Sequence, residues 1–212
     1  MNEHATRIAV FASGNGSNLQ AILDHFDGPA FGVAEVALVV SDKPTAGALD
    51  RARARDIPAH VVHHADAPAI ERLLDALRIE LVVLAGYLKF VPAEVVRAWH
   101  GRILNVHPAL LPAFGGPGMY GLRVHAAVLA AGARTSGPTV HFVDEQYDHG
   151  PVIAQEQVPV LPGDTPQALA ARVLEAEHRL YPRVIADVAA GRVRLSSRGE
   201  VIGASSPSLS SS

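Results

Sequence analysis

Residues 7–26 read RIAVFASGNGSNLQAILDHF, and this stretch decides the fold. Its first part, residues 7–13, is rich in residues that favour strands and ends at Gly14-Asn15-Gly16. Residues 18–26 instead repeat apolar side chains at the spacing of one helix face. The stretch therefore predicts a strand, a tight turn and a helix, in that order.

The same pattern repeats through the first half of the chain. Further strand-sized apolar stretches occupy 36–41, 60–64, 81–86 and 103–107, and helical segments lie between them at 46–56, at 67–78 and from about Pro92. Continuous apolar strands that alternate with helices are typical of a parallel sheet covered on both faces. We therefore expect an α/β fold with a doubly wound, mostly parallel sheet.

The second half departs from this alternation. Residues 138–145 and 151–160 both have strand character, and no helix separates them, which predicts an antiparallel excursion at the edge of the sheet. A long C-terminal helix is then predicted to begin at Thr165 and Pro166, with threonine as N-cap, and to run to about Ala190.

The length of the chain, 212 residues with 49% hydrophobic content, suits one domain. The last segment, SSRGEVIGASSPSLSSS, has too little apolar surface to order itself. We therefore predict one domain over residues 1–195 and a flexible tail over residues 196–212.

Composition argues against several classes of partner. A formal charge of -3 and a pI near 6.4 provide no basic field for nucleic acid. The chain has no cysteine, its start lacks the layout of a signal peptide, and its apolar stretches fall short of the ~20 residues that cross a bilayer. None of the 11 histidines forms an H-E-x-x-H arrangement. We expect a cytoplasmic protein with no metal, nucleic-acid or membrane partner.

The glycine turn after the first strand has two interpretations. A strand that enters a helix through Gly14–Asn18 aims free backbone N–H groups and the positive end of the helix dipole at one point, which suits a phosphate. The dinucleotide fingerprint is incomplete, because Leu19 stands where a third glycine is expected. A plain turn is the alternative, and the side chains of Ser17 and Asn18 favour the phosphate.

Asn105 and His107 form the strongest candidate for chemistry. Side chains alternate along a strand, so both emerge on one face, at the carboxyl end where doubly wound sheets bind ligands. A core histidine beside a turn-forming asparagine is the structural alternative. For acyl transfer, the amide can donate to a developing oxyanion, and the imidazole can change charge near neutral pH.

A carboxylate could complete this pair from the loop after Val143. Asp144, Glu145 and Asp148 all lie there, and the residue pattern does not choose among them.

Several long motifs, in the same order along the chain, resemble the folate-dependent glycinamide ribonucleotide formyltransferases. The resemblance spans about residues 7–185 and rests on SGNGSNLQAIL, NVHPALLPAF, GMYGLRVHAAVL, SGPTVHFVDEQYDHGPVIAQ and EAEHRLYP. It implies a Rossmann-like formyltransferase fold and transfer of a formyl group from 10-formyltetrahydrofolate to the amine of glycinamide ribonucleotide, in purine biosynthesis. The resemblance also implies that the transfer passes through a tetrahedral intermediate and needs no metal. A monomer or a homodimer is expected.

The resemblance also implies roles for individual residues. It makes Asn105, His107 and Asp148 catalytic, which selects Asp148 among the three acids. It assigns Gly16, Ser17, Asn18 and Glu177 to the ribonucleotide, and Leu88, Lys89, Phe90, Val91, Asn105 and Val143 to the folate. Independently, Glu177 falls on the apolar side of the predicted helix, so it needs either an arginine partner or a ligand.

Departures from the family pattern and rival functions accompany the resemblance. Arg123 replaces the first histidine of a family loop, whereas His125 keeps the second. A formyltetrahydrofolate deformylase would use water as acceptor, and a nucleotide-binding module would need no catalysis. The deformylase leaves the anion-binding turn unexplained, and the module leaves Asn105, His107 and Asp148 unexplained.

Overall fold

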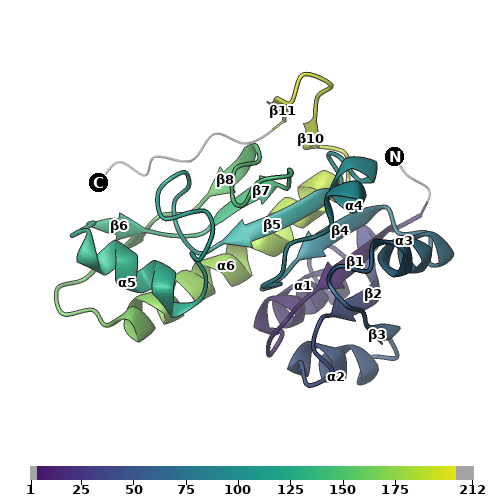
Figure 1. The fold of residues 1–212 in the computed structure, drawn as a ribbon, viewed down its shortest axis with the longest axis horizontal. Coiled ribbons are helices and arrows are strands. Elements are labelled where there is room, and N and C mark those ends of the chain that lie inside the picture. Colours follow the sequence, from purple (N-terminus) through teal and green to yellow (C-terminus); the bar gives the residue numbers. More distant parts are fainter. Residues whose placement is uncertain (1–3, 204–212) are drawn as a thin grey trace.

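A computed structural model describes residues 4–203, which build a seven-stranded sheet of order β3-β2-β1-β4-β5-β7-β8 (Figure 1). The strands of this sheet are β1 (Thr6–Phe11), β2 (Ala34–Ser41), β3 (Ala59–Val61), β4 (Leu81–Leu84), β5 (Ile103–His107), β7 (Thr139–Phe142) and β8 (Val152–Gln155). The helices are α1 (Ser17–Asp27), α2 (Gly47–Arg53), α3 (Ala67–Ala76), α4 (Ala93–Ala98), α5 (Leu122–Ala130) and α6 (Pro166–Ala189).

Helices cover both faces of the sheet, which confirms the doubly wound prediction. β1 pairs in parallel with β2 and β4. Its residues Ile8 and Val10 pack on the side of α1, α2 and α6, whereas Ala9 and Phe11 pack on the side of α3 and α4. Each central strand is thus buried twice, which is why these strands read as unbroken apolar runs.

The antiparallel excursion is also confirmed, because β7 runs antiparallel to both β5 and β8. In this register Asn105 lies opposite His141, and His107 lies opposite Thr139. The predicted strand segment at 151–160 divides into two parts. Only β8 joins the main sheet, while β9 (Val158–Pro159) pairs with β6 (Thr135–Ser136).

The long helix α6 begins and ends close to the predicted residues. The Thr165 side chain accepts a hydrogen bond from the backbone N–H of Ala168 and so caps the helix. The buried Tyr181 hydroxyl lies 3.1 Å from the carbonyl oxygens of both Leu84 and Leu104, which ties α6 to β4 and β5. This anchor holds Glu177, one turn earlier, beneath the carboxyl ends of these strands.

After α6 the chain forms a hairpin of β10 (Arg194–Leu195) and β11 (Val201–Ile202). Residues 196–203 of the predicted tail lie in this hairpin, and residues 204–212 lie outside the described part of the chain. The division into a domain and a flexible tail stays a prediction.

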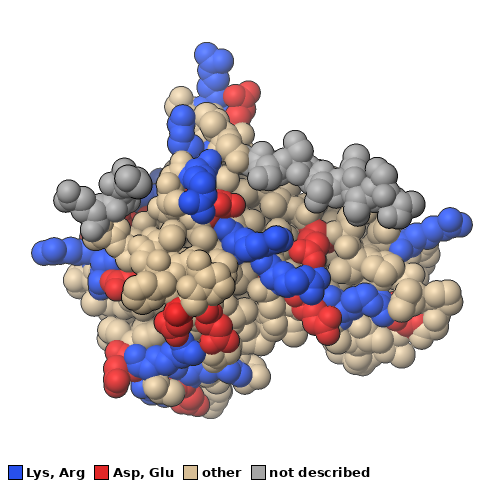
Figure 2. All heavy atoms as spheres, turned by 180° about the vertical axis from the view of Figure 1, so that it is seen from behind, with Lys and Arg blue, Asp and Glu red and all other residues tan. Residues whose placement is uncertain are grey.

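Positive and negative side chains lie among one another on the face seen in Figure 2. Ion pairs join side chains of opposite charge elsewhere in the described structure too, as Arg179 and Arg183 both pair with Glu156. Among the helices described between residues 4 and 203, none is both long and apolar enough to span a membrane.

Candidate active site

The glycine turn brings the start of α1 close to α2. Gly16 has a left-handed backbone with φ +77°, and a Cβ there would lie 2.8 Å from the Cα of Ala48. Only glycine satisfies both demands. The turn therefore places Ser17 and Asn18 in the first turn of α1, beside the carboxyl end of β1.

A cavity of about 380 Å³ lies at the carboxyl ends of β4 and β5. Its walls come from the segment after β4, the end of β5, the glycine-rich segment 116–121 and the loop 143–148, and Asn18 and Glu177 reach it from α1 and α6. A cavity at the carboxyl ends of the strands matches the usual ligand position in doubly wound sheets.

β5 delivers Asn105 and His107 into this cavity. Ile103, on the same face of the strand, packs into the core cluster that contains residues of α3 and α4. Both polar side chains line the cavity, although His107 is almost fully buried. The sequence-based expectation that the two side chains share one face is therefore met.

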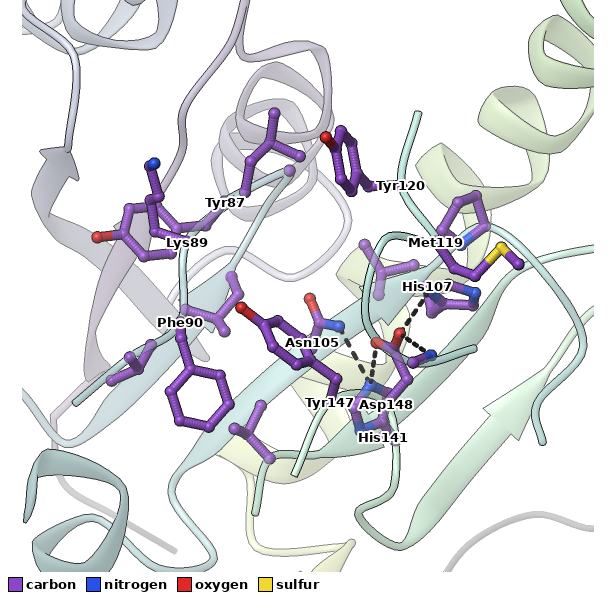
Figure 3. Close-up of a pocket in the computed structure, with 18 of the residues that line it drawn as sticks. Tyr87, Lys89, Phe90, Asn105, His107, Met119, Tyr120, His141, Tyr147 and Asp148 are labelled. Carbon is purple, nitrogen blue, oxygen red and sulfur yellow. Dashed lines mark hydrogen bonds and ion pairs between the residues drawn. The ribbon is translucent and has the colours of Figure 1, made fainter. Parts of the chain in front are cut away.

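Asp148 lies against His107 and not out in solvent. Its Oδ2 is 3.4 Å from His107 Nδ1 and accepts a hydrogen bond of 2.9 Å from the backbone N–H of Gly116 (Figure 3). The loop turns sharply here: Asp148 has φ +52°, and a Cβ on Gly150 would lie 1.9 Å from the Phe142 carbonyl oxygen. This sharp turn directs the carboxylate into the cavity.

Burial by itself would raise the pKa of Asp148. The hydrogen bond and positive charge of His107, together with the N–H of Gly116, outweigh this effect and hold the pKa of the carboxyl below its usual value. Asp148 is therefore a carboxylate at neutral pH.

The two other acids of the loop have partners elsewhere. Asp144 Oδ2 lies 2.7 Å from Nδ1 of the exposed His149, and Glu145 forms an ion pair of 2.9 Å with Arg97 of α4. Neither contacts His107 in an ion pair or hydrogen bond among the described residues. Geometry thus distinguishes three acids that spacing alone could not.

Both ring nitrogens of His107 face acceptor oxygens. Nε2 lies 2.8 Å from the carbonyl oxygen of Phe114, so this nitrogen carries a hydrogen, and Nδ1 faces the Asp148 carboxylate. The ring therefore lies between a backbone carbonyl and a carboxylate, and each can accept a hydrogen bond from it.

Glu177 is buried and has an amide, not an arginine, as its partner. Asn18 Nδ2 donates a hydrogen bond of 2.6 Å to Glu177 Oε2, which joins α1 to α6. Burial raises the pKa of Glu177, while the Asn18 hydrogen bond and the charge of His107 oppose the shift. Asn18 Oδ1 is buried without a hydrogen-bond partner among residues 4–203, although the side chain lines the cavity.

The segment after β4 forms the apolar wall opposite the catalytic candidates. Leu88, Lys89, Phe90 and Val91 all line the cavity, as does Val143. Phe90 and Tyr147 meet with ring centroids 4.9 Å apart. The buried Ser13 hydroxyl accepts a hydrogen bond of 2.9 Å from the backbone N–H of Leu88 and so fixes this wall to the end of β1.

Nearly all of the predicted site residues meet in this one cavity. Gly16 and Ser17 are the exceptions, because they lie at the start of α1 outside the cavity lining. Sequence reasoning missed His141, Tyr147, Tyr87, Met119 and Tyr120, all of which line the cavity. Among these five residues, strand alternation pointed to His141 alone. Its partner could not be predicted, because the residue that it faces depends on the register of β7 against β5.

Within residues 4–203, no group of three or more potential metal-ligating side chains comes together. The cavity instead presents amide, imidazole and carboxylate groups beside an apolar wall. Such a set can stabilise an oxyanion, hold a cation and move protons.

Comparison with known proteins gives consistent results. The model of the formyl transferase family matches residues 6–185. The chain is 47% identical over 197 residues to a protein named chloroplastic phosphoribosylglycinamide formyltransferase in Arabidopsis thaliana, covering 89% of this chain and 67% of that protein. It is 48% identical over 187 residues to a protein of the same printed name as that relative, in Vigna unguiculata, covering 84% of this chain and 59% of the Vigna protein. The chain therefore spans about two thirds or less of the length of these plant relatives.

A solved structure agrees over almost the whole chain. The crystal structure of glycinamide ribonucleotide transformylase 1 from Symbiobacterium toebii superposes with a TM-score of 0.85 at 40% identity, over 95% of both chains.

Proposed function

Because the chain belongs to the formyl transferase family, we propose that it transfers a formyl group from 10-formyltetrahydrofolate to the amine of 5'-phosphoribosylglycinamide. One observation carries this proposal. Asn105, His107 and Asp148 meet in a single cavity whose opposite wall is apolar enough for a folate. The apolar wall would therefore bind the folate, and the three polar residues would act on the formyl group.

In the proposed reaction, the neutral amine of the ribonucleotide attacks the formyl carbon, and a new C–N bond forms. The carbonyl electron pair moves onto oxygen to give a tetrahedral oxyanion. This collapses with cleavage of the bond to N10, while one proton passes from the attacking nitrogen to N10. The products are the formylated amide and tetrahydrofolate.

Asn105 and His107 are the proposed partners of the oxyanion. Both can donate hydrogen bonds, and His107 adds positive charge in a site shielded from water. The oxyanion would take the place of the Phe114 carbonyl as acceptor for His107 Nε2. Phe114 has φ +57° and lies in the segment before the glycines that line the cavity, so a shift of this carbonyl leaves β5 in place.

Asp148 is proposed to keep His107 charged and to pass the proton through water. The 3.4 Å contact between Asp148 Oδ2 and His107 Nδ1 and the lowered pKa of Asp148 support this role. Glu177 is proposed to hold the amine of the ribonucleotide. A buried carboxylate at the cavity, whose hydrogen-bond partner among residues 4–203 is a neutral amide, suits a ligand N–H.

The two substrates are proposed to enter from different sides. The ribonucleotide phosphate would bind Gly16, Ser17 and Asn18, where the start of α1 offers free N–H groups. The folate would lie along the wall of residues 88–91 and against Val143 and Asn105.

A cytoplasmic location, a monomer or homodimer, and the absence of nucleic-acid, membrane and metal partners remain predictions. The net charge of -3 supports the absence of a nucleic-acid partner.

The test is an assay of tetrahydrofolate release from 10-formyltetrahydrofolate, with and without glycinamide ribonucleotide. Release that requires the amine is expected. Equal release without it would favour the deformylase, and no release in either case would favour the non-catalytic module. Asn105→Ala should lower turnover by about 10²–10³, the usual cost of removing an oxyanion donor.

A further inference from the structure

His141 is a buried histidine that the proposed reaction does not use. It lies on β7 directly across from Asn105 on β5, and its Nε2 is 3.1 Å from Asn105 Nδ2. Only 2% of the residue is exposed. Figure 3 shows dashed lines that join it to both Asn105 and Asp148.

The hydrogen bonds of His141 determine which ring nitrogen carries its hydrogen. Nδ1 lies 2.8 Å from the carbonyl oxygen of Phe142, which can only accept, so Nδ1 is the donor. In the neutral ring Nε2 is then an acceptor, and the group facing it must donate. The partner is therefore the NH₂ group of Asn105 and not its carbonyl oxygen.

This contact fixes the orientation of the Asn105 amide. With one Nδ2 hydrogen held by His141, one hydrogen and Oδ1 remain for a ligand in the cavity. A rotation by 180° would bring Oδ1 against the lone pair of His141 Nε2, which is repulsive. His141, and not the substrate, therefore determines the orientation of the Asn105 amide.

We propose that His141 is a positioning residue that holds the Asn105 amide with its N–H ready for the oxyanion. This inference rests on the proposed function, because it assigns a purpose to the orientation of Asn105. It concerns a residue that touches Asn105 and not the reacting atoms.

The arrangement has a dependence on pH. If His141 gains a proton, its Nε2–H faces the Nδ2–H of Asn105, and two donors oppose each other. The charged and titratable groups that face His141 are Asp148, at 3.9 Å, Asp144 and His107. Burial lowers the pKa of His141, and this effect outweighs the opposing Phe142 carbonyl and the two carboxylates. Neutral His141 thus persists to lower pH than an ordinary histidine.

Two variants of similar size separate positioning from packing. In His141→Gln, the side-chain carbonyl can accept from Asn105, and the titratable group is gone. In His141→Leu, the apolar volume remains and the acceptor is lost. His60→Gln is the control, because His60 is exposed on β3 at the opposite edge of the sheet.

The measurements are kcat, the KM of each substrate, and the kcat profile from pH 5 to pH 8. We expect kcat of His141→Leu to fall about 10-fold, short of the 10²–10³ lost with a donor itself, while each KM changes less than about 3-fold. His141→Gln should keep most of the turnover, and its kcat relative to the unmodified enzyme should rise as the pH falls. Equal loss in both variants, or a ratio that is constant with pH, overturns the proposal.

A second measurement does not depend on activity. The ¹⁵N NMR spectrum of the histidine rings at pH 7 should show His141 as the neutral tautomer with hydrogen on Nδ1. A hydrogen on Nε2, or a charged ring, overturns the proposal even if His141→Leu fails to fold. If the enzyme transfers no formyl group while the tautomer is as expected, the proposed function fails and the Asn105–His141 contact stands.

Discussion

The amide of Asn18 donates a 2.6 Å hydrogen bond to the buried carboxylate of Glu177, joining the first helix to the last. The two residues lie 159 positions apart in the sequence. Both side chains line the cavity. Their contact also buries an ionisable group that has no ion-pair partner among the described residues, and such burial costs folding free energy.

Glu177→Gln should therefore stabilise the protein at neutral and higher pH. Because the pKa of Glu177 is raised by burial, the folded protein holds the proton to higher pH than the unfolded chain. The contribution of Glu177 to the free energy of unfolding therefore falls as the pH rises from the ordinary pKa of glutamate through the raised pKa of Glu177. Glutamine has no such loss and can still accept from Asn18.

Thermal unfolding of both proteins between pH 4 and pH 8 measures this effect. The Tm advantage of Glu177→Gln should grow with pH and vanish at the acid end. The same variant should raise the KM of the ribonucleotide without a matching change in the KM of the folate. A lower Tm for the variant at pH 8 would contradict the prediction.

Asp148→Asn should lower kcat by at least about 10², because His107 loses the carboxylate that favours its charged form. Steady-state kinetics at pH 7.5 measures the loss. Asp144→Asn and Glu145→Gln are matched controls from the same loop, since these acids pair with His149 and Arg97 instead. The assignment is wrong if either control loses as much turnover as Asp148→Asn.

Thr139→Val should destabilise the fold through the turn that follows His107. The buried Thr139 hydroxyl accepts from the backbone N–H of Leu111 and from Gln155 Nε2, and it donates to the carbonyl of Ala109. Valine leaves these buried groups without their partner, at a cost of about 1–3 kcal/mol for each one left unsatisfied. Urea unfolding at pH 7 measures the change, and Thr139→Ser, which keeps the hydroxyl, should lose much less.

Ser13→Ala should weaken folate binding selectively. The Ser13 hydroxyl donates to Asp42 Oδ1 at 2.6 Å and accepts from the N–H of Leu88, so its loss frees the wall that the folate is proposed to contact. Of the two hydrogen bonds lost, the one from Leu88 N–H holds the wall, and its loss, near 1 kcal/mol, corresponds to a rise in folate KM of about 5-fold. The KM of the ribonucleotide should stay within about 2-fold.

Ser41→Ala is the control for Ser13→Ala. Ser41 is also buried at the end of a strand and its hydroxyl bonds to a backbone N–H, that of Lys43, away from the cavity wall. Equal changes in both KM values for Ser13→Ala would indicate a general loss of structure instead of a local one.

Much of the fold follows from local pattern. The apolar runs of β1, β2, β4 and β5 indicate a sheet buried on both faces, because a strand with one exposed face would alternate apolar and polar residues. Thr165 and Pro166 mark the start of α6 through capping chemistry that involves only neighbouring residues. The pairing of β9 with β6 was not predictable, since strands of two residues carry no periodic signal.

The sequence by itself determined the doubly wound sheet and the shared face of Asn105 and His107, because strand alternation and helix periodicity are properties of consecutive residues. Residue pattern left open which acid meets His107, which group partners Glu177 and which histidine contacts Asn105, and the tertiary structure decided all three. Those contacts join residues from different elements. They depend on strand register, on the positive φ of Asp148 and on the packing of α6 against α1, none of which is encoded in residue spacing.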